Sequence, residues 1–172
     1  EYEHAKARGA EIYAEICGAG LTADAHHMTA PHPEGRGALA AMREAMREAG
    51  LSLEQIHHIN THGTSTPLGD VAEIQAISRL FGENAKNINI NSTKSMTGHL
   101  LGAAGAIEAI ATVLAITNGI VPPTINHSTD DEQLPDLNYT FNKAQERDIE
   151  AALSNTFGFG GHNACLDFRK AK

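Results

Sequence analysis

Two histidines, a lysine and a glycine-rich turn are the parts of this chain whose residue types could do chemistry. His62 lies in the stretch THGTSTPLGD, Lys94 and His99 lie in NSTKSMTGHLLGAAG, and the turn FGFGGHN begins at Phe157. Each follows a stretch with the pattern of a strand, and open α/β sheets place ligands at the carboxyl ends of their strands. We therefore expect these groups to converge on one pocket.

The chemistry that suits these groups is the stabilisation of negative charge on an oxygen. A small-residue helix, predicted over residues 100–117, follows His99 directly. The unpaired N–H groups and partial positive charge of a helix N-terminus keep an imidazole neutral, so it serves as a hydrogen-bond donor. Clustered glycines likewise let backbone N–H groups approach a reacting oxygen, with the flanking aromatic residues forming a wall or gate.

The predicted elements place these groups at strand ends. Thr66 can cap a helix over residues 67–81, with Pro67 at the position where a missing N–H costs nothing. The first strand is expected to close in a turn at Gly18 and Gly20. The whole pattern predicts an α/β fold. The other expected elements are a helix over residues 36–49 and strands over residues 11–21, 56–60, 87–91, 151–156 and 163–169.

The helix predicted after His99 is apolar on all sides except at Glu108 and Thr112. Such a helix is expected to be buried within a layered domain. Its length is also close to that of a membrane span. A span is rejected, because the segment is rich in Gly and Ala rather than Leu, carries Glu108 in its middle and barely reaches the lower length limit.

Length, charge and cysteine content narrow the class of protein. A chain of 172 residues fits one domain, and a net charge of −8 without a basic stripe argues against nucleic acid or an anionic membrane as the main partner. Two distant cysteines and no signal peptide before the first strand favour a cytoplasmic location. The opening EYEHAKARGA resembles the tail of a helix, so we expect a piece of a longer polypeptide, although a processed N-terminus would look similar.

Other candidate groups have ordinary structural explanations. Cys17 and Cys165 fall in predicted strands, where a thiol packs as a small buried hydrophobe. His26, His27 and His32 share a loop without closing ligands, so surface or substrate-entrance histidines are favoured over a zinc site. The glycines of FGFGGHN precede a strand pattern, whereas a dinucleotide fingerprint requires a helix there.

Four motifs, in order along the chain, resemble those of one enzyme family. They are THGTSTPLGD, NSTKSMTGHLLGAAGAIEA, VPPTIN and SNTFGFGGHN. Together they resemble the carboxyl-terminal half of the β-ketoacyl-acyl carrier protein synthases, specifically the elongating II-type enzymes of bacterial fatty acid synthesis. The match covers essentially the whole chain. It implies a thiolase-like fold, in which two α/β halves pack as an α-β-α-β-α sandwich and residues 1–172 form one α-β-α half with a mixed sheet.

The resemblance also implies a reaction and its partners. In this family a cysteine of the amino-terminal half takes an acyl group from acyl carrier protein. Malonyl-acyl carrier protein then decarboxylates, and its carbanion attacks that thioester in a Claisen condensation. No cofactor is expected to be bound, since the substrates are carried on the phosphopantetheine of acyl carrier protein. The implied partners are the amino-terminal half, acyl carrier protein and a second copy in a homodimer.

Particular residues match functional positions of the family. By motif, His62 and His99 are the paired histidines that grip the malonyl thioester carbonyl and stabilise the enolate. Lys94 is expected to orient and tune His99. Glu108 matches a family glutamate close to that lysine, and a buried acid with a cationic partner is physically sensible where an isolated one is not. Simple ion pairing of Glu108 is an equally good explanation.

Further matches concern the carrier arm and the acyl tunnel. Thr64 and Thr66 match residues that hydrogen-bond the phosphopantetheine arm. The backbone N–H of Phe159 matches part of the oxyanion hole, and its ring matches the gate to the acyl tunnel. Phe157 is expected to serve packing. His162, where relatives carry Thr, leaves the substrate preference open.

One departure from the complete family is clear. No stretch of this chain matches the cysteine-bearing nucleophile loop, so the amino-terminal half with its nucleophile is expected to be absent and the chain to be inactive alone. The main alternative is a non-catalytic partner subunit, such as the chain-length-setting relatives of ketosynthases. A cysteine at a strand-to-helix turn upstream would favour the enzyme. A His-dependent metal hydrolase is a weaker alternative, because the ligand spacing is poor.

Overall fold

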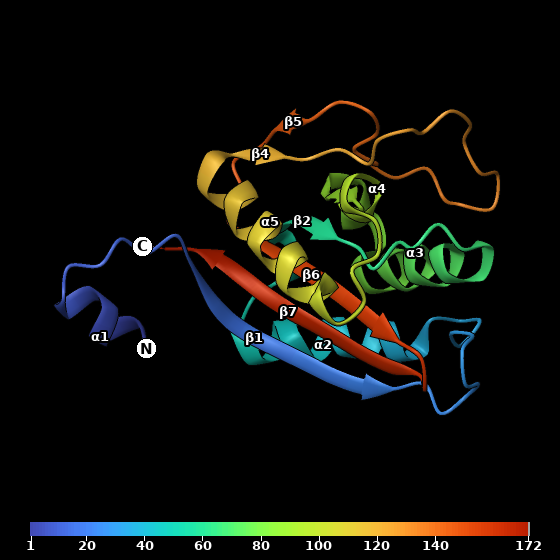
Figure 1. Ribbon diagram of the computed structural model, residues 1–172, viewed down its shortest axis with the longest axis horizontal. Helices are drawn as coiled ribbons and strands as arrows, with labels where there is room; N and C mark the ends of the chain where they lie inside the picture. Colours follow the sequence, from blue (N-terminus) through green and yellow to red (C-terminus); the bar gives the residue numbers. More distant parts are fainter. Residues whose placement is uncertain (172) are drawn as a thin grey trace.

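A five-stranded sheet forms the centre of the computed structural model, which describes residues 1–171 (Figure 1). Its strands are β1 (Ala14–Ala23), β2 (Ile56–Asn60), β3 (Asn89–Asn91), β6 (Ala151–Gly158) and β7 (His162–Lys170). They lie in the order β1-β7-β6-β2-β3. The pairs β1–β7 and β7–β6 are antiparallel, whereas β6, β2 and β3 run parallel. This mixed sheet confirms the predicted α/β class.

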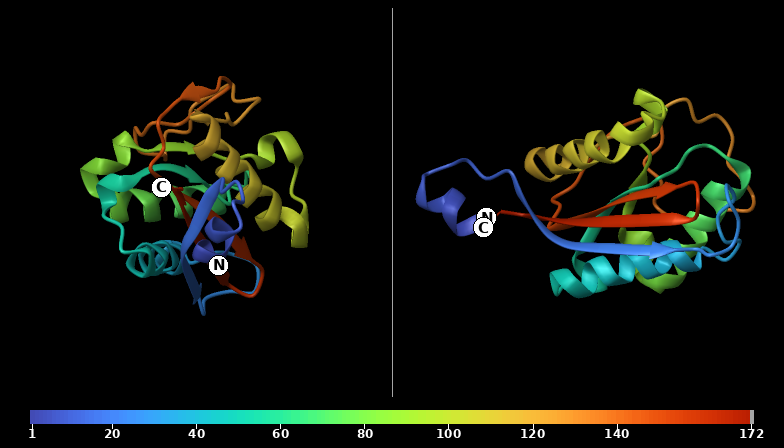
Figure 2. Two further views of the ribbon diagram at one scale, coloured as in Figure 1. Left: turned by 90° about the vertical axis from the view of Figure 1, so that its left-hand side faces the viewer. Right: turned by 60° about the horizontal axis from the view of Figure 1, so that its bottom comes forward.

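Helices cover both faces of the sheet, which gives three layers (Figure 2). The helices of these layers are α2 (Arg36–Ala49), α3 (Pro67–Phe81) and α5 (Ala104–Asn118). α2 and α3 share one face with an apolar cluster that includes Met42 and Ile77. α5 lies on the other face, over a smaller cluster around Ile116 and Phe168. The predicted bounds of α2, β2 and α3 are confirmed.

The remaining elements are short. They are α1 (Tyr2–Ala7), α4 (Lys94–Thr97), β4 (Ile120–Val121), β5 (Gln145–Glu146) and 3-10 turns at Leu53–Gln55, Gly82–Asn87 and Leu101–Ala103. β4 and β5 form a second, two-stranded sheet. Single bridges join Thr124 to Phe141 and Ile90 to Tyr139, so the segments around Thr124 and Tyr139 are partly extended. α1 lies apart from the sheet (Figure 2).

The turn predicted at the glycines of β1 is wrong. β1 continues through Gly18 and Gly20 to Ala23, paired with β7 along its length. A Cβ at either glycine would overlap a backbone carbonyl oxygen of α2, that of Ala45 or Ala41. These glycines therefore let α2 pack directly on the strand backbone, and they do not end the strand.

The helix predicted over residues 100–117 begins later than expected. α4 and a 3-10 turn come first, and α5 begins at Ala104. Gly98 has φ +71° and Leu101 has φ +53°, and neither value fits a right-handed helix. His99 lies between these two residues. The predicted position of His99 at the first turn of the helix is therefore wrong.

α5 buries two polar side chains against the sheet together with Ile116, and it exposes several of its apolar side chains. Glu108 is 2% exposed and Thr112 is fully buried, whereas Ile110 is 56% exposed and Leu114 is 50% exposed. In the described chain the helix is therefore buried on the side that faces the sheet and exposed on an apolar side, so its expected burial within a layered domain is only partly realised. By length and composition, residues Leu101–Asn118 could cross a membrane, but core helices of other proteins pass the same test. One such segment is weak support for a span, and its rejection stays a prediction.

Candidate active site

One carboxylate holds the loop that follows β2. The backbone N–H groups of His62 and Gly63 donate to the two carboxylate oxygens of Glu73, each over 2.9 Å. Glu73 lies in α3 with 3% of its surface exposed, and it also accepts from Asn155 Nδ2 of β6 at 3.0 Å. Glu73 thus ties the loop to α3 and β6 and fixes where His62 stands.

Sequence reasoning misses Glu73, because a carboxylate that serves backbone N–H groups belongs to no spaced motif. The available signal is its position among the buried apolar residues of α3, such as Ile74 and Ile77, where a carboxylate needs partners. Burial raises the pKa of Glu73 to about 7, and the hydrogen bonds from Gly63, Asn155 and His62 oppose that rise.

His62 lies against a second histidine and an aromatic ring. Its ring centroid is 5.5 Å from that of His99, with the planes at 85°, and 5.5 Å from that of Phe157. Burial lowers the pKa of His62 to about 3, and positive charge at Lys94 and His99 adds to this effect. His62 Nδ1 is buried without a hydrogen-bond partner in the described chain. His62 is therefore neutral at physiological pH.

His99 is exposed, and its own loop orients it. Its Nδ1 accepts a hydrogen bond from the backbone N–H of Leu101 at 3.2 Å. Because this nitrogen is an acceptor, the neutral ring carries its proton on Nε2. The donor role expected for His99 thus depends on this hydrogen bond and not on a helix N-terminus.

Lys94 and Glu108 form a buried ion pair near the histidines. Lys94 Nζ meets Glu108 Oε1, and both side chains are almost completely buried. Burial raises the pKa of Glu108, while the Lys94 ammonium lowers it. A buried charge is stable when it is paired, so each member of the pair favours the ionised form of the other. The role expected for Lys94 in orienting His99 stays a prediction.

A polar network fixes α5 against the sheet. Asn60 Nδ2, at the end of β2, donates to the backbone oxygen of Glu108 at 3.3 Å and to Thr93 Oγ1 at 3.2 Å. Thr112 Oγ1 donates to the same Glu108 oxygen at 2.8 Å. These bonds set the rotation of α5 and direct the Glu108 side chain toward Lys94. They also explain why Thr112 faces inward.

Thr64 and Thr66 stand at the start of α3 with their hydroxyl oxygens 3.1 Å apart. Thr66 occupies the cap position as predicted, and Pro67 begins the helix, but the Thr66 hydroxyl makes no capping bond. Asp70 Oδ1 accepts from the Ser65 N–H at 3.2 Å instead. The two hydroxyls are therefore left at the accessible rim of the site.

Phe159 lies in the turn between β6 and β7, and 78% of its surface is exposed. Gly160 and Gly161 follow it with φ values of +88° and +79°, which favour glycine. Phe157, expected to serve packing, lies near the end of β6 and is the aromatic residue that contacts His62. The tunnel gate expected of the Phe159 ring and the oxyanion role of its N–H stay predictions.

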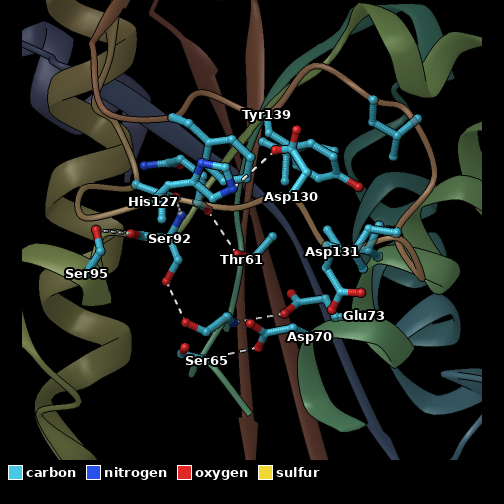
Figure 3. Close-up of a pocket in the computed structure, with 18 of the residues that line it drawn as sticks. Thr61, Ser65, Asp70, Glu73, Ser92, Ser95, His127, Asp130, Asp131 and Tyr139 are labelled. Atoms are coloured by element: carbon cyan, nitrogen blue, oxygen red, sulfur yellow. Dashed lines mark hydrogen bonds and ion pairs between the residues drawn. The ribbon is translucent and has the colours of Figure 1, made fainter. Parts of the chain in front are cut away.

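A pocket of about 970 Å³ is lined by Thr61 and Gly63, the sequence neighbours of His62, and by the start of α3 (Figure 3). Asp70 and Glu73 stand across it from His127 and Tyr139 (Figure 3). Thr66 also lines it, but the two candidate histidines, Lys94 and Phe159 do not. The structure thus brings His62 close to His99 and within the electrostatic influence of Lys94, but it does not place these groups in this pocket.

The two cysteines are not placed for chemistry. Cys165 is buried as expected, whereas Cys17 is only half-buried, at an irregularity in the pairing of β1 with β7. Burial raises the pKa of both thiols, that of Cys17 to about 12, so neither is a reactive thiolate. Within residues 1–171 no group of three or more His, Cys, Asp or Glu side chains is placed to hold a metal ion.

The amino-acid sequence of this chain is similar to those of known proteins. The family described as "Beta-ketoacyl synthase, C-terminal domain" matches residues 13–128. The 3-oxoacyl-[acyl-carrier-protein] synthase 2 of Vibrio harveyi is 54% identical over 171 residues, which are 99% of this chain and 41% of that protein. The chain thus spans about two-fifths of the length of this relative.

Solved structures agree in fold. A type II PKS acyl-carrier protein in complex with its ketosynthase matches with a TM-score of 0.96 and 41% identity, over 100% of this chain and 42% of that one. The ishigamide ketosynthase/chain length factor matches with a TM-score of 0.93 and 41% identity, over 99% of this chain and 41% of that one. The expected thiolase-like ketosynthase fold is thereby confirmed.

Proposed function

Because this chain belongs to the β-ketoacyl synthase family and matches its C-terminal domain, we propose that it is the carboxyl-terminal half of an elongating 3-oxoacyl-acyl carrier protein synthase. The observation that carries the proposal is the neutral His62 beside His99, next to the Lys94–Glu108 pair. The reaction is the decarboxylative condensation of malonyl-acyl carrier protein with an enzyme-bound acyl thioester in fatty acid elongation.

The two imidazoles supply hydrogen bonds to the oxygen on which charge develops. The malonyl carboxylate leaves as CO₂, and its electron pair moves toward the thioester carbonyl to give an enolate. His62 and His99 donate to that oxygen, which stabilises the enolate without requiring a proton to be transferred. The enolate carbon then attacks the acyl thioester on a cysteine of the amino-terminal half. A C–C bond forms, the C–S bond breaks, and the cysteine thiolate leaves.

The rim of the site would receive the carrier arm. The Thr64 and Thr66 hydroxyls, 3.1 Å apart at the start of α3, suit hydrogen bonds to the amide groups of phosphopantetheine. Phe159, exposed on its glycine-rich turn, suits a gate to the acyl tunnel, and its backbone N–H would contribute to the oxyanion hole. The acyl-carrier protein bound to a ketosynthase in a structure of the same fold supports this partner.

The outward face of α5 suits the interface with the amino-terminal half. Its exposed apolar side chains include Ile107, Ile110 and Leu114. Large exposed apolar patches mark interaction sites, and this one adjoins the proposed catalytic histidines. On this account the chain is incomplete and inactive alone. In the assembled enzyme it would work as part of a cytoplasmic homodimer without a bound cofactor.

Replacement of His99 by Ala in the whole enzyme tests the assignment. Loss of one oxyanion donor is expected to lower malonyl-acyl carrier protein decarboxylation by about 100-fold or more. His57→Ala, at the opposite end of β2, is the matched control and should leave the rate unchanged. Full decarboxylation by the His99 variant would refute the proposed role.

A second candidate is a non-catalytic partner of the chain-length-factor type. The solved ketosynthase/chain length factor of the same fold supports this possibility. The presence of His62, Lys94 and His99 favours the enzyme, since a subunit without chemistry has no need of an enolate-stabilising pair. The amino-acid sequence upstream of this chain discriminates: a cysteine at a strand-to-helix turn supports the enzyme, and another residue there supports the partner subunit.

A further inference from the structure

The loop between β1 and α2 is fastened to the β6–β7 turn. The backbone N–H of Asp24 donates to the oxygen of Gly161 at 2.8 Å, and the N–H of Gly160 donates to the oxygen of Met28 at 2.7 Å. Asp24 Oδ1 also accepts from Asn163 Nδ2 at 2.9 Å. The conformation of the loop around Met28 therefore governs how firmly the turn is held.

Two histidines of this loop cap its own backbone. The N–H groups of Thr29 and Ala30 both donate to His27 Nδ1, each over 3.1 Å. The N–H of Glu34 donates to His32 Nδ1, also over 3.1 Å. A ring nitrogen that accepts such a bond carries no proton, so each neutral ring bears its proton on Nε2. Only the neutral imidazoles can make these three bonds.

We propose that residues 24–34 form a proton-sensitive clasp on the β6–β7 turn, closed while His27 and His32 are neutral. Protonation puts a hydrogen on Nδ1 of each ring, which then faces backbone N–H donors. The three capping bonds are lost, and the turns that follow the two histidines loosen. Because Met28 lies in the first of these turns, its bond to Gly160 loosens as well.

Charged and titratable neighbours surround the clasp in the loop and at the start of α2. Asp24 Oδ2 accepts from the backbone N–H of His32 at 2.9 Å, and the His26 ring centroid is 5.1 Å from that of His32. Arg36, the first residue of α2, pairs with Glu34. Protonation of His26 together with His32 would place two like charges side by side, which favours opening of the loop.

The β6–β7 hairpin, to which the clasp is fastened, contributes one more titratable group. The ring of His162 lies against the turn, since a Cβ built on Gly160 would stand 3.2 Å from His162 Nε2. The same turn carries Phe159. A link between the clasp and access to the acyl tunnel rests on the proposed function, whereas the clasp itself does not.

Hydrogen exchange of backbone amides in the full-length protein tests the proposal. Exchange is measured at pH 7.5 and at a lower pH at which ring ¹⁵N spectra show both imidazoles protonated. After correction for intrinsic rates, protection at Thr29, Ala30 and Glu34 is expected to fall roughly fivefold at the lower pH, the factor for one ordinary hydrogen bond. The double variant His27→Asn with His32→Asn should keep its protection at that lower pH. Asn offers an oxygen acceptor in an equivalent Asx turn and cannot be protonated there.

His57→Asn is the matched control, because His57 Nδ1 also accepts a backbone N–H, that of Glu150 at 3.1 Å, but outside the clasp. It should leave the pH response of the loop unchanged. Wild-type protection that does not change with pH, or an equal response in the double variant, would overturn the proposal. Ring ¹⁵N spectra of the wild type give a check that needs no variant: protonated Nδ1 in His27 and His32 at pH 7.5 would also overturn it. None of these readouts requires condensing activity, so failure of the proposed function would be recognised separately.

Discussion

At the scale of residues, the site is a pair of imidazoles, of which burial keeps His62 neutral and a loop hydrogen bond orients His99. Burial and nearby positive charge hold the pKa of His62 at about 3, and the Leu101 N–H places the proton of neutral His99 on Nε2. Both rings can therefore donate a hydrogen bond to the enolate oxygen without either histidine acting as a base. The rate of an enolate-forming step at this site should therefore not titrate with His62 between pH 5 and 8.

Glu73 is the residue on which the position of His62 depends most directly. In a Glu73→Gln variant one backbone N–H of the loop faces an amide donor instead of a carboxylate oxygen. We expect a loss of about 1–3 kcal/mol in unfolding free energy. The displaced His62 should lower malonyl decarboxylation by roughly 10- to 100-fold. Chemical unfolding and decarboxylation assays of the full-length enzyme measure both quantities.

Glu83→Gln, an exposed change just beyond α3, is the control and should alter neither quantity. A Glu73 variant that is less stable but decarboxylates at the normal rate would show that Glu73 supports the fold without positioning His62.

At the scale of elements, the sequence was informative where pattern and geometry coincide. The bounds of α2, β2 and α3 follow from apolar period and from Pro67. Gly18 and Gly20 led to the wrong prediction of a turn. In the sequence, a glycine that lets a helix approach a strand looks the same as a glycine that ends the strand. The start of α5 could not be foreseen either, since leucine rarely adopts the positive φ that Leu101 has, and no residue type in this stretch signals it. Motif spacing found His62, Lys94 and His99, but not Glu73, whose partners are backbone groups.

A buried carboxyl group in β7, next to β1, is expected to make the stability of the fold depend on pH. Both oxygens of Asp167 are buried without partners in the described chain, and burial raises its pKa from 3.8 to about 7. The folded state therefore holds this proton to higher pH than the unfolded state does. Stability should fall as the pH rises from about 4 to about 7.

An Asp167→Asn variant should remove this dependence. Relative to the variant, we expect the wild type to lose roughly 1–4 kcal/mol of stability across that interval, measured by unfolding of the full-length protein at several pH values. Asp136→Asn, an exposed change, should behave as the wild type does. Parallel pH profiles for the wild type and the Asp167 variant would show that this carboxyl is ionised in the fold.

At the scale of the whole molecule, one apolar face of α5 is exposed. α5 buries Glu108 and Thr112 and exposes Ile110 and Leu114, the reverse of an ordinary surface helix. The proposed amino-terminal half would account for this inversion if it covers the face. The apolar period of α5 alone does not distinguish a core helix from an interface helix, and the exposed face is expected only when the chain is taken as one half of a two-half fold.

The exposed face should make the isolated chain associate with itself. Light scattering is expected to show oligomers or aggregates for the wild type and a smaller species for the double variant Ile110→Asn with Leu114→Asn. The same variant should bind the amino-terminal half less tightly. Leu68→Asn, an exposed change on α3, is the control. A wild-type chain that stays monomeric and binds no apolar dye would contradict this prediction.

The central claim is that this chain completes a condensing site when it meets the amino-terminal half. The most direct test combines the two halves with acyl- and malonyl-acyl carrier protein and follows the carrier-bound products by intact mass, with each half alone as control. The account predicts a β-ketoacyl product extended by two carbons in the combined sample only, and its loss with the His99→Ala chain. If the halves demonstrably associate and nothing is extended or decarboxylated, the catalytic roles of His62, Lys94 and His99 are contradicted.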